Sequence, residues 1–214
     1  MIIFENLPSE KPYKEFSSFY NKAKSLGQTQ IEAMAISSYN SSKKQVDSRY
    51  VNLKYIIGEE WIFFSNYNSK KASDFSSNKS ISALFFWQSI NLQVRIKGEI
   101  FKTSEGFSDK HFSERKLDKN ALAISSRQSK KIESYEMVKE NFYKTLDDAS
   151  SLKLRPNYWG GFSFKPFEFE FWQGNESRLN KRECYSFDKT KEIVPKAQEI
   201  ALKNANKYPI KIPN

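Results

Sequence analysis

The chemistry open to this sequence depends on basic side chains placed at the ends of its expected strands. In the stretch EFEFWQGNESRLNKRECYSF, an alternating strand ends near Gly174, and Arg178, Asn180 and Arg182 then follow at every second position. If the chain extends again after a glycine turn, these three side chains share one face of a strand. Two guanidinium groups on one face are costly unless an anion lies there. We therefore expect an anionic ligand at this face.

A second set of basic residues lies in the middle of the chain. Lys70 and Lys71 open a short expected helix, and free N–H groups at a helix N-terminus together with two lysines suit a phosphate. Arg49 and Lys54 belong to one expected strand, where alternation puts them on opposite faces unless the strand is bulged. Residues 127–129, Arg-Gln-Ser, add a polar cluster. Each pair alone is typical of solvated surface charge. Together they supply several groups suited to binding phosphate.

Other kinds of site find little support in the sequence. It has no G-x-G-x-x-G or Walker A loop, so the usual nucleotide cradles are missing. His111 is the one histidine and Cys184 the one cysteine, and they lie far apart in the sequence. We therefore expect no metal site, no Ser-His-Asp triad and no internal disulfide.

Length and composition predict a single basic domain and leave several kinds of anionic partner open. The 214 residues carry a formal charge of +10, which fits nucleic acid, an anionic membrane surface or phosphorylated small molecules. The lysines are spread along the chain, which argues against a nucleic-acid binder. No signal peptide and no apolar run of about 20 residues are evident, so we expect a cytoplasmic protein with no membrane partner.

Hydrophobic periodicity predicts strands that come in hairpin pairs with helices between them. The expected strands are residues 31–39, 48–56, 60–66, 81–88, 92–104, 158–173 and 177–187. The expected helices are residues 11–26, 68–78, 105–116, 134–149 and 195–207, with a short helix or ordered loop at 121–132. This order predicts an α+β fold with an antiparallel barrel or sandwich of six or seven strands. We expect one domain over residues 1–214, with an atypical helical tail from about residue 188.

Two local patterns make more specific predictions about the last strands. Alternation in residues 167–172 predicts that Phe167, Phe169 and Phe171 face a core while the residues between them face the other way. Gly160 and Gly161, next to Trp159, predict a bulge or a close approach of two backbones.

Five sequence blocks in series resemble the flavin-dependent pyridoxine/pyridoxamine 5'-phosphate oxidases. The blocks are SRYVNLKYI, IFFSNYNSKKASDF, ALFFWQSINLQVRIKGEI, HFSERKLDKNALAISSRQS and YWGGFSFKPFEFEFWQGNESRLNKR, within residues 10–187. The resemblance implies an FMN-binding split barrel and a homodimer whose active sites are shared between the two subunits. It also implies oxidation of pyridoxine or pyridoxamine 5'-phosphate to pyridoxal 5'-phosphate, with molecular oxygen as acceptor and hydrogen peroxide as product.

The same resemblance implies roles for individual residues. FMN contacts from one subunit fall on Arg49, Tyr50, Val51, Asn52, Phe64, Ser65, Lys70, Lys71 and Gln93. Contacts that complete the flavin site from the other subunit fall on Gln128, Ser129, Trp172 and Arg182. The substrate and its phosphate fall on Lys54, His111, Arg115, Lys119, Arg178 and Asn180, the last two being the catalytic pair.

Three substrate positions depart from the family pattern. His111 stands where the family has tyrosine, Lys119 where it has serine, and Asn180 where it has histidine. Asparagine forms hydrogen bonds but does not titrate near neutral pH. Two alternatives therefore stay open beside the oxidase: a related flavin oxidase of another ring, such as a phenazine-type substrate, and a protein that binds FMN or a vitamin B6 phosphate with little turnover.

Overall fold

The computed structural model describes residues 1–148, 152–187 and 193–194, and within them one nine-stranded sheet closes on itself. Neighbouring strands follow the order β3-β2-β5-β6-β7, and β4 pairs with both β7 and β3 to complete a ring of strands. The strands are β1 (Ile3–Glu5), β2 (Ala33–Asn40), β3 (Gln45–Ile57), β4 (Glu60–Asn66), β5 (Ser80–Trp87), β6 (Leu92–Lys102), β7 (Trp159–Gln173), β8 (Lys181–Phe187) and β9 (Ile193–Val194). The α+β class and the barrel are thus confirmed.

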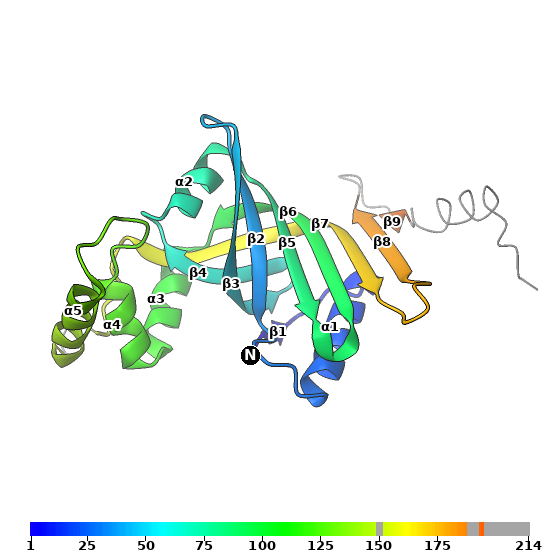
Figure 1. The fold of residues 1–214 in the computed structure, drawn as a ribbon, viewed down its shortest axis with the longest axis horizontal. Coiled ribbons are helices and arrows are strands. Elements are labelled where there is room, and N and C mark those ends of the chain that lie inside the picture. The colour runs from blue at the N-terminus through cyan, green and yellow to red at the C-terminus, as the bar shows by residue number, and fades with distance from the viewer. Residues whose placement is uncertain (149–151, 188–192, 195–214) are drawn as a thin grey trace, which may run out of the picture.

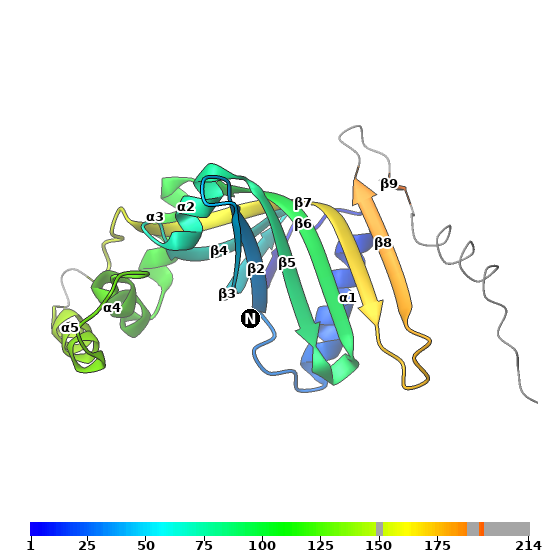
Figure 2. The ribbon, with the colours of Figure 1, turned by 45° about the horizontal axis from the view of Figure 1, so that its top comes forward.

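The long strand β7 divides the sheet into two parts. Its first half pairs with β4, from Trp159 to Phe164, and its second half pairs with β8, from Glu168 to Gln173. The strands β5, β6, β7 and β8 consequently run side by side toward β9 (Figure 2). The predicted strands correspond to β2–β8, while β1, parallel to β3, and β9 are additional.

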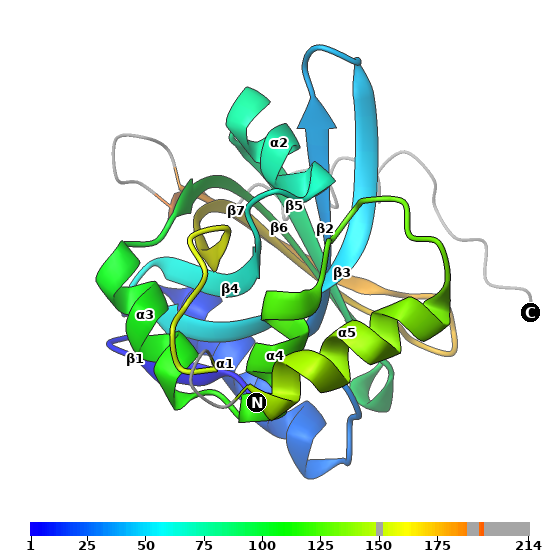
Figure 3. The same cartoon turned by 90° about the vertical axis from the view of Figure 1, so that its left-hand side faces the viewer.

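The helices cover two separate parts of the barrel. They are α1 (Lys11–Ser25), α2 (Lys70–Ser77), α3 (Glu105–Glu114), α4 (Leu117–Ser125) and α5 (Tyr135–Asp147), with a short 3-10 turn η1 (Gln88–Ile90). Helices α3, α4 and α5 gather at one end of the molecule, and β8 and β9 lie at the other (Figure 1). The view from the α5 end shows α2 beside the barrel and α5 in front of it (Figure 3).

Aromatic side chains fill the barrel and hold α1 against it. Phe16 of α1 is fully buried and packs edge-on against Trp61, with their ring centroids 4.5 Å apart. The same ring lies 5.3 Å from Phe85 and 5.2 Å from Trp87. A large buried aromatic contributes about 2–3 kcal/mol through area alone, so this cluster fixes α1 and the barrel as one unit.

The backbone of β7 explains where alternation succeeds and where it fails. Phe169 and Phe171 are buried as predicted, but Phe167 is 38% exposed. The register between β6 and β7 shifts at Lys97/Gly98, where Gly98 pairs with Pro166 and Lys97 with Glu168. The unpaired Phe167 sits in this bulge, and its side chain leaves the core face.

Other local predictions meet mixed outcomes. A side chain at Gly160 would collide with the Tyr67 ring, and one at Gly161 with Thr103. The close approach at these two glycines is therefore to side chains, and not to a second backbone as predicted. The segment 121–132, expected as a short helix or an ordered loop, contains both, because α4 spans Leu117–Ser125 and residues 126–132 follow it outside any helix. The expected helix at residues 195–207 lies outside the described residues.

Candidate functional site

A cavity of about 470 Å³ opens between β3, β4 and α2 and brings together many of the predicted phosphate-binding residues. We call it the Arg49–Lys71 pocket. It is lined by Asp47, Ser48, Arg49, Tyr50, Val51, Phe64, Ser65, Lys70, Lys71, Gln128 and Ser129. Of the first-subunit set that the sequence predicts, Asn52 and Gln93 do not line it.

Lys71 is the most deeply placed cation of this pocket. Its side chain is only 7% exposed, and Nζ donates to Ser65 Oγ at 2.9 Å and to Ser69 Oγ at 3.3 Å. Burial, and secondarily the positive charge of Arg49, lower its pKa to about 8. A buried ammonium beside a guanidinium is costly in the empty pocket and favourable when an anion binds. The pocket is therefore built for a negative ligand.

Arg49 reaches the same pocket from β3. Its Nη1 donates to Ser38 Oγ at 2.7 Å, and its Nη2 lies 3.5 Å from the buried carboxylate of Asp74. Lys70 instead turns toward Asp47, with 2.6 Å between Nζ and the carboxylate oxygen. Of the two predicted lysines, Lys71 is thus the one whose charge faces the pocket without an acidic partner among the described residues.

The segment after α4 closes the pocket from the opposite side. Ser65 Oγ donates to Gln128 Oε1 at 3.4 Å, and the backbone N–H of Lys70 donates to Ser129 Oγ at 3.3 Å. Both contacts occur within one chain. The chain thus brings Gln128 and Ser129 to its own pocket, and a contribution of these residues from a second subunit stays a prediction.

A second cavity, of about 200 Å³, shares a wall with the first. We call it the Arg115–Lys119 pocket. It is lined by Phe64, Ser65, Asn66, Arg115, Lys119, Leu122, Ala123, Ser126, Gln128 and Trp159. Phe64, Ser65 and Gln128 line both pockets, so two basic cavities lie side by side.

Arg115 is prepared for an anion by its surroundings. Its guanidinium carbon lies 4.4 Å from the centroid of the Trp159 ring, and Nη2 donates to the carbonyl oxygen of Lys119 at 3.2 Å. Nη1 is buried and has no hydrogen-bond partner in the described part of the chain. Burial lowers the pKa of this guanidinium, although it stays charged at neutral pH. An unpaired buried N–H is costly and would be satisfied by a ligand oxygen.

Four of the six predicted substrate residues, Lys54, His111, Arg178 and Asn180, line neither pocket, and the first two lie close to the wall that the pockets share. The His111 ring stacks on Phe64, with centroids 3.7 Å apart, and its Nδ1 is hydrogen-bonded to Tyr55 Oη at 2.7 Å. Burial, and then the charges of Arg115 and Lys54, lower the His111 pKa to about 4, so the ring is neutral at pH 7. Lys54 pairs with Glu32 at 3.5 Å, and the β3 register shifts at Lys54. His111 supports the wall between the pockets instead of entering them.

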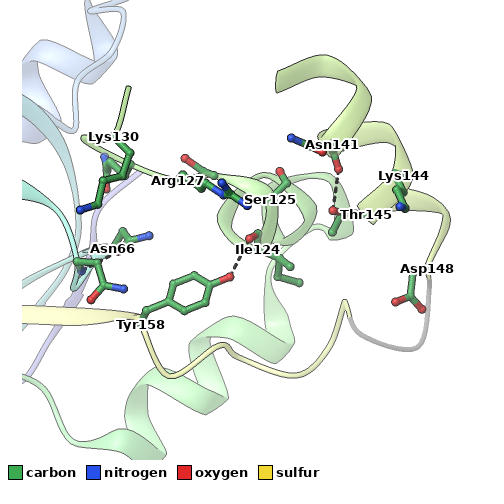
Figure 4. A pocket seen from close by; sticks show the side chains of 13 residues that line it. Asn66, Ile124, Ser125, Arg127, Lys130, Asn141, Lys144, Thr145, Asp148 and Tyr158 are labelled. Atoms are coloured by element: carbon green, nitrogen blue, oxygen red, sulfur yellow. Dashed lines mark hydrogen bonds between the residues drawn. The ribbon is translucent and has the colours of Figure 1, made fainter. Parts of the chain in front are cut away.

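A third, larger cavity lies beyond the second one, between α4, α5 and the start of β7 (Figure 4). It measures about 750 Å³ and carries Arg127, Lys130 and Lys144 on its lining. Tyr158 Oη donates to the carbonyl oxygen of Ile124 at 2.7 Å and so ties the start of β7 to the end of α4. Gln128 lines this cavity too, so the three cavities adjoin at this residue.

Comparison with known proteins assigns the chain to a family. Residues 23–147 match the family model described as pyridoxamine 5'-phosphate oxidase, and residues 159–197 match that of the pyridoxine 5'-phosphate oxidase C-terminal dimerisation region. The chain is 38% identical over 184 residues to the pyridoxine/pyridoxamine 5'-phosphate oxidase of Cytophaga hutchinsonii, covering 85% of this chain and 84% of that protein. The chain belongs to the pyridoxamine 5'-phosphate oxidase family.

Further relatives of this oxidase family agree. The chain is 36% identical over 186 residues to the chloroplastic pyridoxine/pyridoxamine 5'-phosphate oxidase 1 of Arabidopsis thaliana, covering 86% of this chain and only 35% of that longer protein. Among solved structures, PhzG of Burkholderia lata, in complex with tetrahydrophenazine-1-carboxylic acid, superposes with a TM-score of 0.80 at 22% identity, covering 88% of this chain and 94% of that one. At this identity the likeness shows the fold, which is the FMN-binding split barrel of the family.

Three further residues that the sequence predicts for the flavin site, Gln93, Trp172 and Arg182, lie on the outer face of the sheet. Gln93 pairs with Trp172, and Trp172 pairs with Arg182, so the three form one row across β6, β7 and β8. None of them lines the three cavities described above. Arg182 Nε lies 3.8 Å from the buried carboxylate of Glu170, which also pairs with Arg95 at 2.8 Å. Within one chain, the anion beside Arg182 is therefore Glu170.

Arg178 and Asn180 do not extend this row. Strand β8 begins at Lys181, so the prediction that both lie on a strand face with Arg182 is wrong. Arg178 has a positive φ of 61°, and its N–H donates to the carbonyl oxygen of Asn175, which marks a turn. Asn180 Oδ1 accepts from the N–H of Asn175 at 3.0 Å. Both residues belong to the loop between β7 and β8.

Sequence reasoning missed several residues of the site. Asp47 and Ser48 line the first pocket, Asn66, Leu122, Ala123, Ser126 and Trp159 line the second, and Asp74 holds Arg49. Asp74 could have been predicted from helical spacing, because it lies three residues after Lys71 and shares its face of α2. The structure describes no group of acidic, histidine or cysteine residues that could hold a metal ion. No helix among the described residues is long and apolar enough to cross a membrane.

Proposed function

We propose that this chain is an FMN-dependent oxidase that converts pyridoxine or pyridoxamine 5'-phosphate to pyridoxal 5'-phosphate. The observation that carries the proposal is the pair of adjoining basic pockets, one with Arg49 and Lys71 and the other with Arg115 and Lys119. Two sites for phosphate monoesters that share a wall suit a reaction between a phosphorylated cofactor and a phosphorylated substrate.

The residues of the Arg49–Lys71 pocket fit the phosphate end of FMN. A guanidinium offers forked donors and a buried ammonium offers a concentrated charge, while Ser65, Ser129 and Gln128 add neutral polar groups. A phosphate dianion would offset the desolvation that lowers the pKa of Lys71. Bound there, FMN would supply the redox chemistry of the family, accepting a hydride equivalent from the substrate and passing electrons to oxygen to give hydrogen peroxide.

The Arg115–Lys119 pocket is our candidate for the substrate phosphate. Arg115 is held by Trp159 and by the Lys119 carbonyl, so its free N–H groups are oriented before a ligand arrives. Lys119 adds a second cation at the entrance. Fixing the phosphate in this way fixes the rest of a small ring, and such positioning lowers a reaction barrier by several kcal/mol. We assign Arg178 and Asn180 to orienting the reacting end of the ring, and Lys54 to the outer part of the substrate site.

A homodimer would complete each site. Trp172 and Arg182 lie in the region that matches the family's dimerisation model, and with Gln93 they form a row on the outer sheet face. The same face exposes large aromatics, with Tyr50 78% and Phe86 55% exposed. A second copy packed on this face would cover those rings and bring its own Trp172 and Arg182 toward the pocket of its partner.

A direct experiment tests the proposal. The purified chain should be yellow or should become so with added FMN, and gel filtration should give a dimer. With pyridoxine 5'-phosphate it should consume oxygen and release hydrogen peroxide and pyridoxal 5'-phosphate. With pyridoxamine 5'-phosphate it should also consume water and release the amine nitrogen as ammonia. A colourless protein that FMN does not reconstitute would reject every flavin-based function.

One observation keeps a second substrate class under test. The Asn180 side chain does not titrate near neutral pH, and its Oδ1 already accepts a hydrogen bond from the N–H of Asn175. This departure concerns the reacting end of the substrate, whereas the two cations near its phosphate fit a phosphate ester. A flavin oxidase of another ring, such as a phenazine-type compound, would release peroxide with that ring and not with the vitamin B6 phosphates. A yellow dimer that oxidises neither would be a binding protein.

A further inference from the structure

A buried carboxylate stands directly behind the Arg49–Lys71 pocket. Asp74 of α2 is fully buried and does not line any of the three cavities. Its Oδ1 accepts from Asn40 Nδ2 at 2.8 Å, and its Oδ2 accepts from Ser38 Oγ at 2.8 Å. Arg49 Nη2 lies 3.5 Å from the same Oδ2. A buried charge with this many partners is a built feature of the molecule.

The hydrogen bonds have a direction that leads from Asp74 to Arg49. Because the Ser38 hydroxyl donates its one proton to the carboxylate, its oxygen is left as an acceptor, and Arg49 Nη1 donates to it at 2.7 Å. The carbonyl oxygen of Ile36 accepts from the same nitrogen at 3.4 Å. Ser38, Ile36 and Asp74 thus hold the guanidinium in place, while Arg49 still lines the cavity.

One helix supplies both halves of this arrangement. Lys71 and Asp74 lie one turn apart on α2, so the helix offers an ammonium to the pocket and a carboxylate to the guanidinium behind it. Ser38 and Asn40 come from β2, next to the strand that carries Arg49. A movement of α2 would thus shift Lys71 and release Arg49 together.

We propose that Asp74 is a positioning residue that, directly and through Ser38, holds the Arg49 guanidinium in the orientation that binds the cofactor phosphate. The proposal deepens the proposed function and rests on it for the identity of the ligand. An arginine side chain loses rotamer freedom when it is fixed, and the contacts with Asp74 and Ser38 fix Arg49 before the phosphate binds. The affinity for the anion rises accordingly.

Two simpler roles for Asp74 predict different results. If the carboxylate acts only through its charge, removing it makes the pocket more positive and tightens anion binding. If it only fastens α2 to β2, losing either hydrogen-bond partner lowers stability to a similar extent without a specific effect on binding. Positioning predicts weaker binding in spite of the more positive pocket, and it predicts that only the partner that touches Arg49 matters.

The test compares three variants by titration of FMN fluorescence at pH 7. Asp74→Asn should weaken FMN binding about tenfold, and Ser38→Ala severalfold. Asn40→Ala is the matched control, because Asn40 contacts the same carboxylate but not Arg49; it should lower the melting temperature and leave FMN affinity within twofold. Tighter binding by Asp74→Asn, or equal losses in Ser38→Ala and Asn40→Ala, would overturn the proposal.

A double-mutant cycle with Arg49→Met isolates the coupling. If Asp74 acts through Arg49, the double variant binds FMN no more weakly than Arg49→Met alone; if the two losses multiply, the proposal is wrong. Ser38→Ala and Arg49→Met form a second cycle if Asp74→Asn does not fold. If the wild-type chain does not bind FMN, the proposed function fails, and the same variants are compared by how much inorganic phosphate raises their melting temperatures. A wild-type chain stabilised by neither ligand would overturn both.

Discussion

Replacing Lys71 by methionine should stabilise the empty protein and weaken its binding of FMN. The lysine pKa falls from its ordinary 10.5 to about 8 because the side chain is buried near Arg49. That difference corresponds to about 3 kcal/mol, which is the cost of holding the charged amine in the folded state below pH 8. Methionine removes this cost but also the hydrogen bonds to Ser65 and Ser69, worth about 1 kcal/mol each. The net gain in the free energy of unfolding at pH 7 is about 1 kcal/mol.

The lowered pKa of Lys71 also predicts how the free energy of unfolding changes with pH. Between pH 8 and 10.5 the unfolded chain still holds the proton on Lys71 while the folded chain has released it. The unfolded state binds more protons in this window, so the lysine's contribution to the free energy of unfolding of the FMN-free protein rises with pH. Lys71→Met should lack this contribution, whereas Lys70→Met, a half-exposed neighbour paired with Asp47, should keep it.

Urea denaturation of the FMN-free proteins and FMN fluorescence titration measure the two quantities. A lost charge-assisted contact to phosphate corresponds to a loss of affinity of about 10- to 100-fold at pH 7. A Lys71→Met variant that is less stable than the wild type by more than 1 kcal/mol, yet binds FMN equally well, would refute the assignment of this lysine to an anion.

Three further predictions concern the substrate side and the backbone. Lys119→Ser should raise KM for the phosphorylated substrate about tenfold and leave FMN affinity unchanged, as measured by peroxide release and fluorescence; a large loss of FMN instead would move Lys119 to the cofactor site. Asn180→His should raise kcat at neutral pH if the substrate is a vitamin B6 phosphate, and unchanged turnover would favour another ring. Gly160→Ala should lower the free energy of unfolding by about 2 kcal/mol or more, because its methyl group would collide with Tyr67, and a urea midpoint equal to the wild type's would contradict the packing.

Much of the framework could be read from local sequence patterns. The spacing of Tyr13, Phe16 and Tyr20 predicts α1, and those residues are buried in the structure. The position of Lys70 and Lys71 at the start of a helix is also correct, because both signals are local. Arg49 and Lys71 share a pocket because strands that are distant in the sequence pair with one another. Only the resemblance to a family predicted this proximity.

What the sequence did not reveal depends on backbone irregularities and on contacts distant in sequence. Phe167 leaves the core because β7 has one extra residue at a bulge, and this residue has no partner on β6. Arg178 does not lie on a strand because Asn175 Oδ1 accepts from the N–H of Ser177 and forms a turn, so that β8 begins only at Lys181. Asp74 accepts a hydrogen bond from Ser38, which lies 36 positions earlier in the sequence. Such contacts follow from the closed barrel, and no periodicity encodes them.

The charges of the two adjoining pockets bear on how they are used. A phosphate monoester carries about −1.5 to −2 at neutral pH, so a cofactor and a substrate together bring nearly −4 to one shared wall. Arg49, Lys71, Arg115 and Lys119 contribute four positive charges around these pockets, and the buried carboxylate of Asp74, 3.5 Å from Arg49, offsets part of the charge of that guanidinium. Phe64 and the neutral His111, stacked 3.7 Å apart, occupy this wall with groups that add no charge of their own. If both ligands bind as proposed, each anion meets its own pair of cations, which offsets the repulsion between the two anions. Removing one cation should weaken chiefly the ligand of its own pocket.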